Sequence, residues 1–208
     1  MKIHFLAIAV FFSIWCNTDA QDLKSLRGSW TLGNATNVAP SRPNYPAHDI
    51  FVEAMNYSSG SNGVKRDIYK AFNKYLQAAD DGHPIAQYKV GACYYYGSGT
   101  KKNSKKAFQY WSQASQADIA EAHYELGKMY YYGEKCKRNY DTALELFHKA
   151  EQADIPGAFY MLGLCYLYGN GVEQNTTTAI EYLEIAVKKG FRDAKYMLDK
   201  ANKGEFEW

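Results

Sequence analysis

The sequence repeats at a constant interval of 36 residues, and this periodicity restricts the possible folds more than any other feature. An alanine and a tyrosine two residues apart return in four successive units (Ala86 and Tyr88, Ala122 and Tyr124, Ala158 and Tyr160, Ala194 and Tyr196). Glycines return at two further positions (Gly91, Gly127 and Gly163; Gly97, Gly133 and Gly169). Repeats of this length are supersecondary units, which bury their hydrophobic faces by stacking on their neighbours.

Each unit has the pattern of two helices. Small and apolar residues share one face from Ala86 to Tyr96, which predicts a first helix, helix A, and Gly97 suits the left-handed conformation that ends a helix. The second helix, helix B, is predicted to begin after a residue that caps helix N-termini well, and each unit has one at the same position (Asp67, Asn103, Asn139 and Asn175). We therefore predict an all-α fold, a right-handed α/α solenoid of antiparallel helix pairs.

The glycines inside helix A predict close packing. A glycine within a helix costs up to about 1 kcal/mol relative to alanine. Because Gly91, Gly127 and Gly163 occupy the same position in three units, we expect tight contacts to offset that cost there.

The three full units closely resemble the Sel-1-like repeat (SLR), a relative of the tetratricopeptide repeat. The resemblance rests on AQYKVGACYYYGSG, AHYELGKMYYYGEK and AFYMLGLCYLYGNGV, and it covers residues 86–193. The chain departs from the family pattern at Glu134–Lys135–Cys136, where a Gly-x-Gly-Val turn is usual, and at Thr100, where Val is usual. The resemblance implies a non-enzymatic adaptor or interaction module.

The two ends of the chain differ from the repeats. Lys2, an apolar run at residues 5–15 and the small residues Thr18 and Ala20 form the pattern of a cleaved signal peptide. We expect a secreted or periplasmic protein, or one of the endoplasmic-reticulum lumen in a eukaryote, with no membrane span after cleavage. The predicted organisation is a signal peptide (1–20), a proline-containing extended or mobile arm (21–49), a degenerate repeat (50–85), three repeats (86–121, 122–157 and 158–193) and a half repeat with a tail (194–208).

Charge and motifs exclude several functions. Lysine and arginine number 24 against 22 acidic residues, with no long basic block, so we expect no nucleic-acid partner. The Ser98–Lys101 segment matches the S-x-x-K pattern of serine acylases, but the S-D-N and K-T-G motifs that accompany it are missing. The five histidines form no i,i+4 pair. We therefore expect no catalytic residues, no cofactor and no metal site.

The remaining cysteines and the glycosylation sequons each have two interpretations. Cys93 and Cys165 share a repeat position with Met129, which indicates small core residues, whereas a disulfide between Cys136 and Cys165 is the alternative. In a eukaryotic secretory pathway three asparagines could carry glycans (Asn34, Asn56 and Asn175), although Asn175 is also the predicted cap of helix B.

The repeated tyrosines indicate a candidate binding surface. A second set of tyrosines occupies a core position of the repeat (Tyr94, Tyr130 and Tyr166). Tyr96, Tyr132 and Tyr168 lie about 200° further around helix A. We predict that they form a partner-binding row on the concave helix A face, together with neighbouring residues of each unit (Lys89, Glu125, Met161, Leu164 and Phe159). The third unit is expected to offer the most apolar pocket. The alternative is that these tyrosines pack against the neighbouring helix A.

The most consistent function is an exported repeat scaffold that binds another protein or a peptide. Two alternatives remain at this stage. One is an enzyme or a β-lactam- or cell-wall-binding protein, as the resemblance to cysteine-rich SLR proteins suggests. The other is a structural subunit of the cell envelope.

Overall fold

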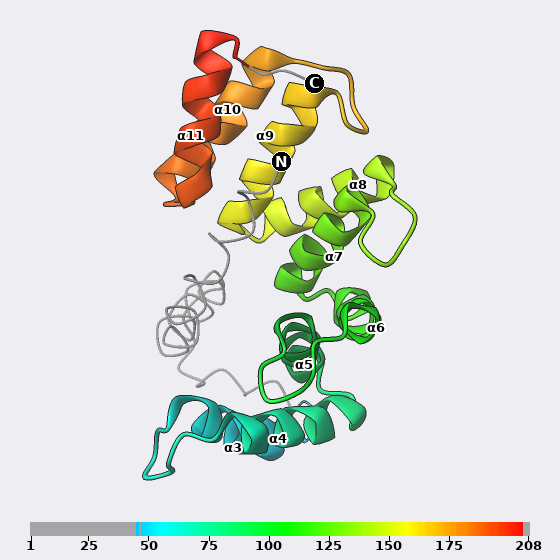
Figure 1. Ribbon diagram of the computed structural model, residues 1–208, viewed down its shortest axis with the longest axis vertical. Coiled ribbons are helices and arrows are strands. Elements are labelled where there is room, and N and C mark those ends of the chain that lie inside the picture. Colours follow the sequence, from blue (N-terminus) through cyan, green and yellow to red (C-terminus); the bar gives the residue numbers. More distant parts are fainter. Residues whose placement is uncertain (1–44, 46, 206–208) are drawn as a thin grey trace, which may run out of the picture.

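The protein, in a computed structural model, is a stack of helices over Tyr45 and residues 47–205, the part of the chain that is described (Figure 1). The predicted signal peptide, most of the proline-containing arm and the sequon at Asn34 lie outside it. Within the described part the helices are α3 (His48–Ser59), α4 (Ile68–Asp80), α5 (Pro84–Tyr96), α6 (Ser104–Gln116), α7 (Ala120–Tyr132), α8 (Tyr140–Gln152), α9 (Pro156–Tyr168), α10 (Thr176–Lys188) and α11 (Arg192–Lys203).

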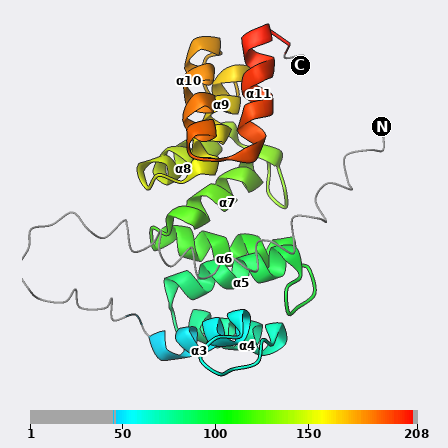
Figure 2. The ribbon, with the colours of Figure 1, turned by 90° about the vertical axis from the view of Figure 1, so that its left-hand side faces the viewer.

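The helices form stacked antiparallel pairs, as the 36-residue period predicts. Helices α3, α5, α7 and α9 are the A helices, each paired with the B helix that follows it, and α11 is the A helix of a final half unit. Figures 1 and 2 show the pairs following one another along the long axis of the molecule. This arrangement confirms the all-α solenoid. No helix in the described ranges has the length and hydropathy that crossing a bilayer would need.

The predicted starts of the B helices and ends of the A helices are confirmed, whereas helix A begins earlier than predicted, at Pro84 in place of Ala86 in the first full unit. The side chains of Asp67, Asn103, Asn139 and Asn175 each accept a hydrogen bond from an amide in the first turn of the B helix that follows. The A helices end at Gly97, Gly133 and Gly169, whose positive φ angles of 81°, 69° and 67° define left-handed C-caps. Local side-chain chemistry therefore determines where most of these helices begin and end.

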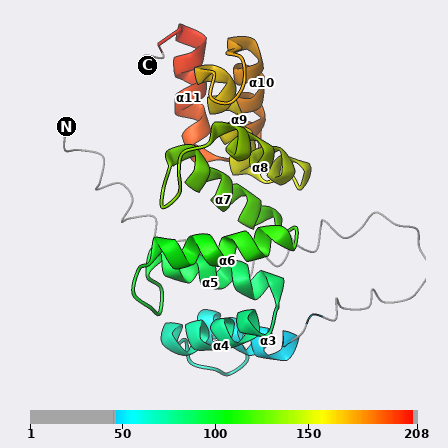
Figure 3. The same cartoon turned by 90° about the vertical axis from the view of Figure 1, so that its right-hand side faces the viewer.

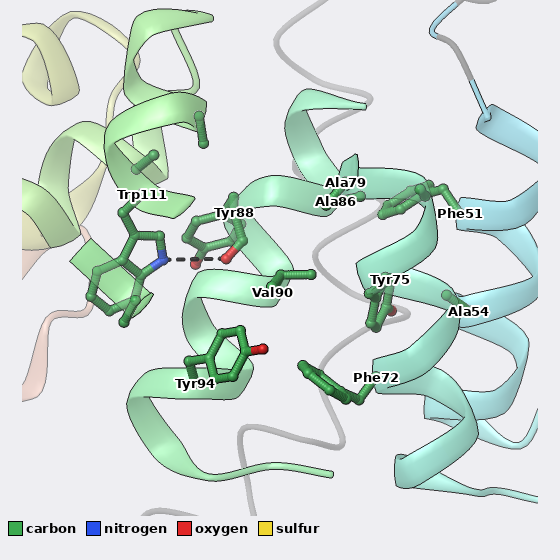
Figure 4. Close-up of a cluster of buried hydrophobic side chains, with 14 of the residues drawn as sticks. Phe51, Ala54, Phe72, Tyr75, Ala79, Ala86, Tyr88, Val90, Tyr94 and Trp111 are labelled. Carbon is green, nitrogen blue, oxygen red and sulfur yellow. Dashed lines mark hydrogen bonds between the residues drawn. The ribbon is translucent and has the colours of Figure 1, made fainter. Parts of the chain in front are cut away.

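The glycines inside the A helices lie against large, fully buried side chains of the B helices. A Cβ atom on Gly127 would lie 2.6 Å from Cε1 of Phe147, and one on Gly163 would lie 2.9 Å from Cγ of Leu183. Gly91 lies in the same way against the buried ring of Trp111, whose Nε1 donates to the carbonyl oxygen of Tyr88 at 3.2 Å (Figure 4). These contacts confirm the close approach that the repeated glycines predict.

The turn that departs from the family pattern keeps the usual conformation. Lys135 has a φ of 63°, close to the 67° of Gly99 and the 76° of Gly171 at the same repeat position. A residue with a Cβ atom is strained in this left-handed region, by roughly 1–2 kcal/mol. The chain therefore retains the turn geometry with an unfavourable residue in it.

A buried histidine connects the first unit to the second. His83 is fully buried, and its Nδ1 accepts a hydrogen bond from the amide of Ala86 at the start of α5. Its Nε2 lies 3.4 Å from Nδ1 of His48, and its ring stacks on Phe51 with centroids 4.4 Å apart. Burial, with a smaller contribution from His48, lowers the pKa of His83 to about 4. The sequence analysis did not distinguish this histidine from the others.

Candidate partner-binding face

The three predicted tyrosines differ in exposure. Tyr132, at the C-terminal end of α7, has 57% of its surface exposed, whereas Tyr96 and Tyr168 are half-buried. Helix α9 touches both α7 and α11, so the A helices form a continuous row across the last units. We name the exposed side of this row, centred on Tyr132, the inner face.

Four other residues of the predicted surface are buried, so the expectation of an exposed apolar pocket in the third unit is wrong. Met161 is 1% exposed, and Leu164, Phe159 and Glu125 are 6%, 7% and 6% exposed. The reason is that α9 lies between α7 and α11, and nine of its thirteen residues are buried. Lys89 is half-buried on α5. Whether a partner contacts this surface stays a prediction.

An ion pair lies at the centre of the inner face. Nζ of Lys128 lies 2.8 Å from Oε2 of Glu125, with 26% of the lysine side chain and 8% of the glutamate side chain exposed. The same Nζ is 4.5 Å from the centroid of the Tyr124 ring. Burial by itself would lower the pKa of Lys128. The Glu125 carboxylate and the nearby tyrosine hydroxyls raise it by more than burial lowers it, so the pKa lies above its usual range. Lys128 is therefore not an ordinary solvated lysine of a helix surface.

Tyrosine hydroxyls surround this ion pair. Burial raises the pKa values of Tyr96 and Tyr124 to about 12 each. Both phenols are therefore neutral near pH 7 and can donate as well as accept hydrogen bonds. A buried charge pair beside neutral hydroxyls and an exposed ring offers a partner both polar groups and apolar area.

The sequence analysis missed Tyr160, Asp193 and Tyr196 on the inner face. Burial raises the pKa of Tyr160, and the Tyr132 hydroxyl and the Asp193 carboxylate add to that rise, which places groups from α7, α9 and α11 near one another. Tyr196 on α11 has 63% of its surface exposed and lies 5.2 Å, centroid to Nζ, from Lys200. The sequence contained a signal for two of them, because Tyr160 and Tyr196 belong to the series of tyrosines that returns every 36 residues. The sequence alone marks that series as a feature of the repeat and does not show that it reaches the surface.

The cysteines and the remaining histidines have structural environments. Cys93, Cys136 and Cys165 are free thiols, so the alternative of a Cys136–Cys165 disulfide is not realised. His123 is 2% exposed, and its two ring nitrogens lie 2.9 Å from Ser115 Oγ and Asp118 Oδ1, at the turn before α7. Among the residues that the structure describes, no three or more His, Cys, Asp or Glu side chains are placed to share a metal ion.

Stacked helix pairs of this kind define an α-solenoid repeat protein. The family model for the Sel1 repeat matches residues 54–83, 84–119, 120–154 and 158–191. The chain belongs to the Sel1 repeat family. Proteins of this family are in general non-enzymatic scaffolds for protein–protein interactions.

Two solved structures and one curated protein are similar to the chain. The Sel1 repeat protein from Oxalobacter formigenes is 28% identical, with a TM-score of 0.67 over 77% of this chain and 66% of that one. A protective antigen of uropathogenic Escherichia coli that displays an SLR fold is 26% identical, with a TM-score of 0.66 over 74% of this chain and 33% of that one. Chitin synthase regulatory factor 3 of Schizosaccharomyces pombe is 38% identical over 58 residues, 27% of this chain and 6% of its own length. The chain thus spans only part of each of these relatives.

Proposed function

We propose that the protein is an exported adaptor, secreted or periplasmic, that binds another protein or a peptide on the inner face. Its scaffold would hold the A helices rigid, while the residues that differ between units select the partner. Export is proposed from the signal-peptide pattern of residues 1–20. N-terminal sequencing of the mature protein is expected to begin at Gln21, and a mature chain that begins at Met1 would contradict export with cleavage.

The observation that supports the inner face is the exposure of Tyr132 beside the Glu125–Lys128 pair. A large aromatic side chain that is 57% exposed leaves apolar area in water. Tyrosine is frequent among residues that dominate binding energy, because it buries a large area at a low entropy cost. Tyr196 supplies a second exposed ring on α11, in the same row of A helices.

The test is an affinity purification from native extracts with the full chain and two sets of variants. The Tyr132→Ala/Tyr196→Ala variant removes the exposed rings of the inner face. The control, Ile185→Ala, removes an apolar side chain that is 37% exposed on the B helix α10. Partners that are lost with the first variant and retained with the control support the proposal. Equal retention of every partner by both variants would place the binding surface elsewhere.

A further inference from the structure

Pairs of cations occupy the turn between helix A and helix B in three successive units. They stand at the same two repeat positions (Lys65 and Arg66, Lys101 and Lys102, Lys137 and Arg138), and all six are exposed. The fourth turn has Glu173 and Gln174 at these positions, so the pattern ends there. We name the surface formed by these six cations in the three turns the basic edge.

Packing between units brings these turns together. A Cβ atom on Gly171 would lie 2.8 Å from the backbone of Tyr140, and one on Gly99 would lie closer still to the backbone of Ile68, so these turns pack on the start of the preceding B helix. The Tyr95 hydroxyl donates to Oε2 of Glu134 in the next turn at 2.9 Å. In Figures 2 and 3 the α5–α6 and α7–α8 turns lie on the same side of the molecule, one above the other. The cation pairs therefore follow one another along a path that winds with the stack, from the α3–α4 turn at the lower left of Figure 1 to the α7–α8 turn at its right.

The six cations of this edge outnumber the carboxylates beside them. Asp67 caps α4, Glu134 accepts the hydrogen bond from Tyr95, and Asp141 lies in the first turn of α8. The first turn of α6 contains no acidic residue, yet Lys105 and Lys106 lie in it. Cations are unfavourable at the positive N-terminal end of a helix dipole, so this arrangement weakens the isolated chain. A bound anion would relieve the repulsion.

The basic edge also has aromatic surface and a hollow. Arg138 Nη1 donates to the hydroxyl of Tyr140 at 3.2 Å, and Lys102 Nζ lies 5.3 Å from the centroid of the Tyr95 ring. A hollow of about 520 Å³ lies between the α7–α8 turn and the next turn of the stack, lined by Tyr130, Lys137, Arg138, Asn139, Tyr140, Asp141 and Gly171. The cations therefore stand beside rings that can contact the apolar parts of a chain bound along the edge.

We propose that the basic edge binds an extended acidic segment of a partner protein. Neighbouring helices pack about 10 Å apart, and an extended peptide rises about 3.3 Å per residue, so every third side chain of the peptide would meet the next cation pair. Aromatic rings between the cations favour a peptide, which has apolar groups between its carboxylates. This surface adjoins the inner face, because the Tyr131 ring lies 5.0 Å from that of Tyr132 and 5.2 Å from that of Tyr140, centroid to centroid. The two proposals rest on different side chains, so either can fail while the other stands.

The test measures binding of labelled peptides to the full chain by fluorescence anisotropy. The probe is a peptide of about ten glutamates, long enough to extend across three turns, and the control peptide has glutamines in their place. The Lys101→Gln/Lys137→Gln variant removes two charges from the basic edge. The matched variant, Lys149→Gln/Lys188→Gln, removes two exposed charges from the opposite ends of B helices. A heparin-derived oligosaccharide and vesicles of anionic lipid serve as competing classes of ligand.

We expect the glutamate peptide to bind more weakly as salt is raised and the glutamine peptide not to bind. The Lys101→Gln/Lys137→Gln variant should lose about three- to tenfold in affinity, and the matched variant should not. An equal loss in the two variants would overturn the proposal, because it would reflect net charge alone. Binding of the oligosaccharide or of the vesicles without the glutamate peptide would also overturn it.

Discussion

Glu125 and Lys128 on α7 form a partly buried ion pair, and the same two positions of α9 hold the buried apolar residues Met161 and Leu164. One repeat thus has a charge pair where the next has an apolar pair. Removing one partner of a buried pair leaves the other charge poorly solvated, whereas replacing both by apolar residues is often neutral or stabilising.

Lys128→Ala is therefore expected to destabilise the protein. Because a quarter of the lysine side chain remains exposed, we expect a loss of about 1–3 kcal/mol, below the cost for a fully buried pair. Urea denaturation measures it. The double variant Glu125→Met/Lys128→Leu copies the apolar pair of α9 and should recover most of the loss. A Lys128→Ala variant as stable as the wild type would contradict the role given to the pair.

Gly127→Val is expected to destabilise strongly, because its Cβ atom would lie 2.6 Å from the ring of Phe147. Overpacking a tight contact typically costs about 1–3 kcal/mol and occasionally more. The control is Glu145→Val at an exposed position of α8, where only helix propensity changes, by a few tenths of a kcal/mol. Similar melting temperatures for the two variants would show that the assigned packing of α7 on α8 is wrong.

Lys135→Gly should stabilise the protein, by up to about 1 kcal/mol. The residue has a φ of 63°, where a side chain is strained and glycine is not. Thermal unfolding checks the sign. Lys137→Gly, which removes a lysine two residues later at a position without a positive φ, is the control and should not stabilise. A lower melting temperature for Lys135→Gly than for the wild type would contradict the strain.

The stability of the first unit should depend on pH through His83. Its pKa falls from 6.5 to about 4 on folding, so the folded protein favours the neutral ring. The contribution to stability is therefore complete above about pH 6.5, decreases as pH falls towards 4, and is constant below that. Urea midpoints at neutral and acidic pH should differ more for the wild type than for His83→Asn, which keeps a capping acceptor but does not titrate. An unchanged pH dependence in the variant would contradict this assignment.

Most of the fold is predictable from the sequence because it depends on local signals. The caps at Asn103, Asn139 and Asn175 and the close approach at Gly127 involve single side chains whose effect is the same in every repeat. Packing between units then follows from the constant 36-residue period.

Side-chain exposure on the inner face was less predictable because it depends on neighbouring units. Met161 and Leu164 have the same helical position as residues with access to solvent, yet α11 and its Met197 help to enclose the cluster to which they belong. Lys128 is held inward by Glu125, one turn earlier on the same helix. The burial of His83 likewise requires His48 and Phe51 from a different helix. The position of a residue along its own helix does not predict these contacts.

Site-specific photo-crosslinking tests the central claim, partner binding on the inner face, most directly. A photoreactive phenylalanine analogue replaces Tyr132 in one sample of the full chain and Ile185, on the B helix α10, in another, since both side chains are exposed. After irradiation in native extract, the account predicts a discrete protein adduct at position 132 that is absent at position 185. Adducts of the same size and yield at both positions, or none at position 132, would contradict it.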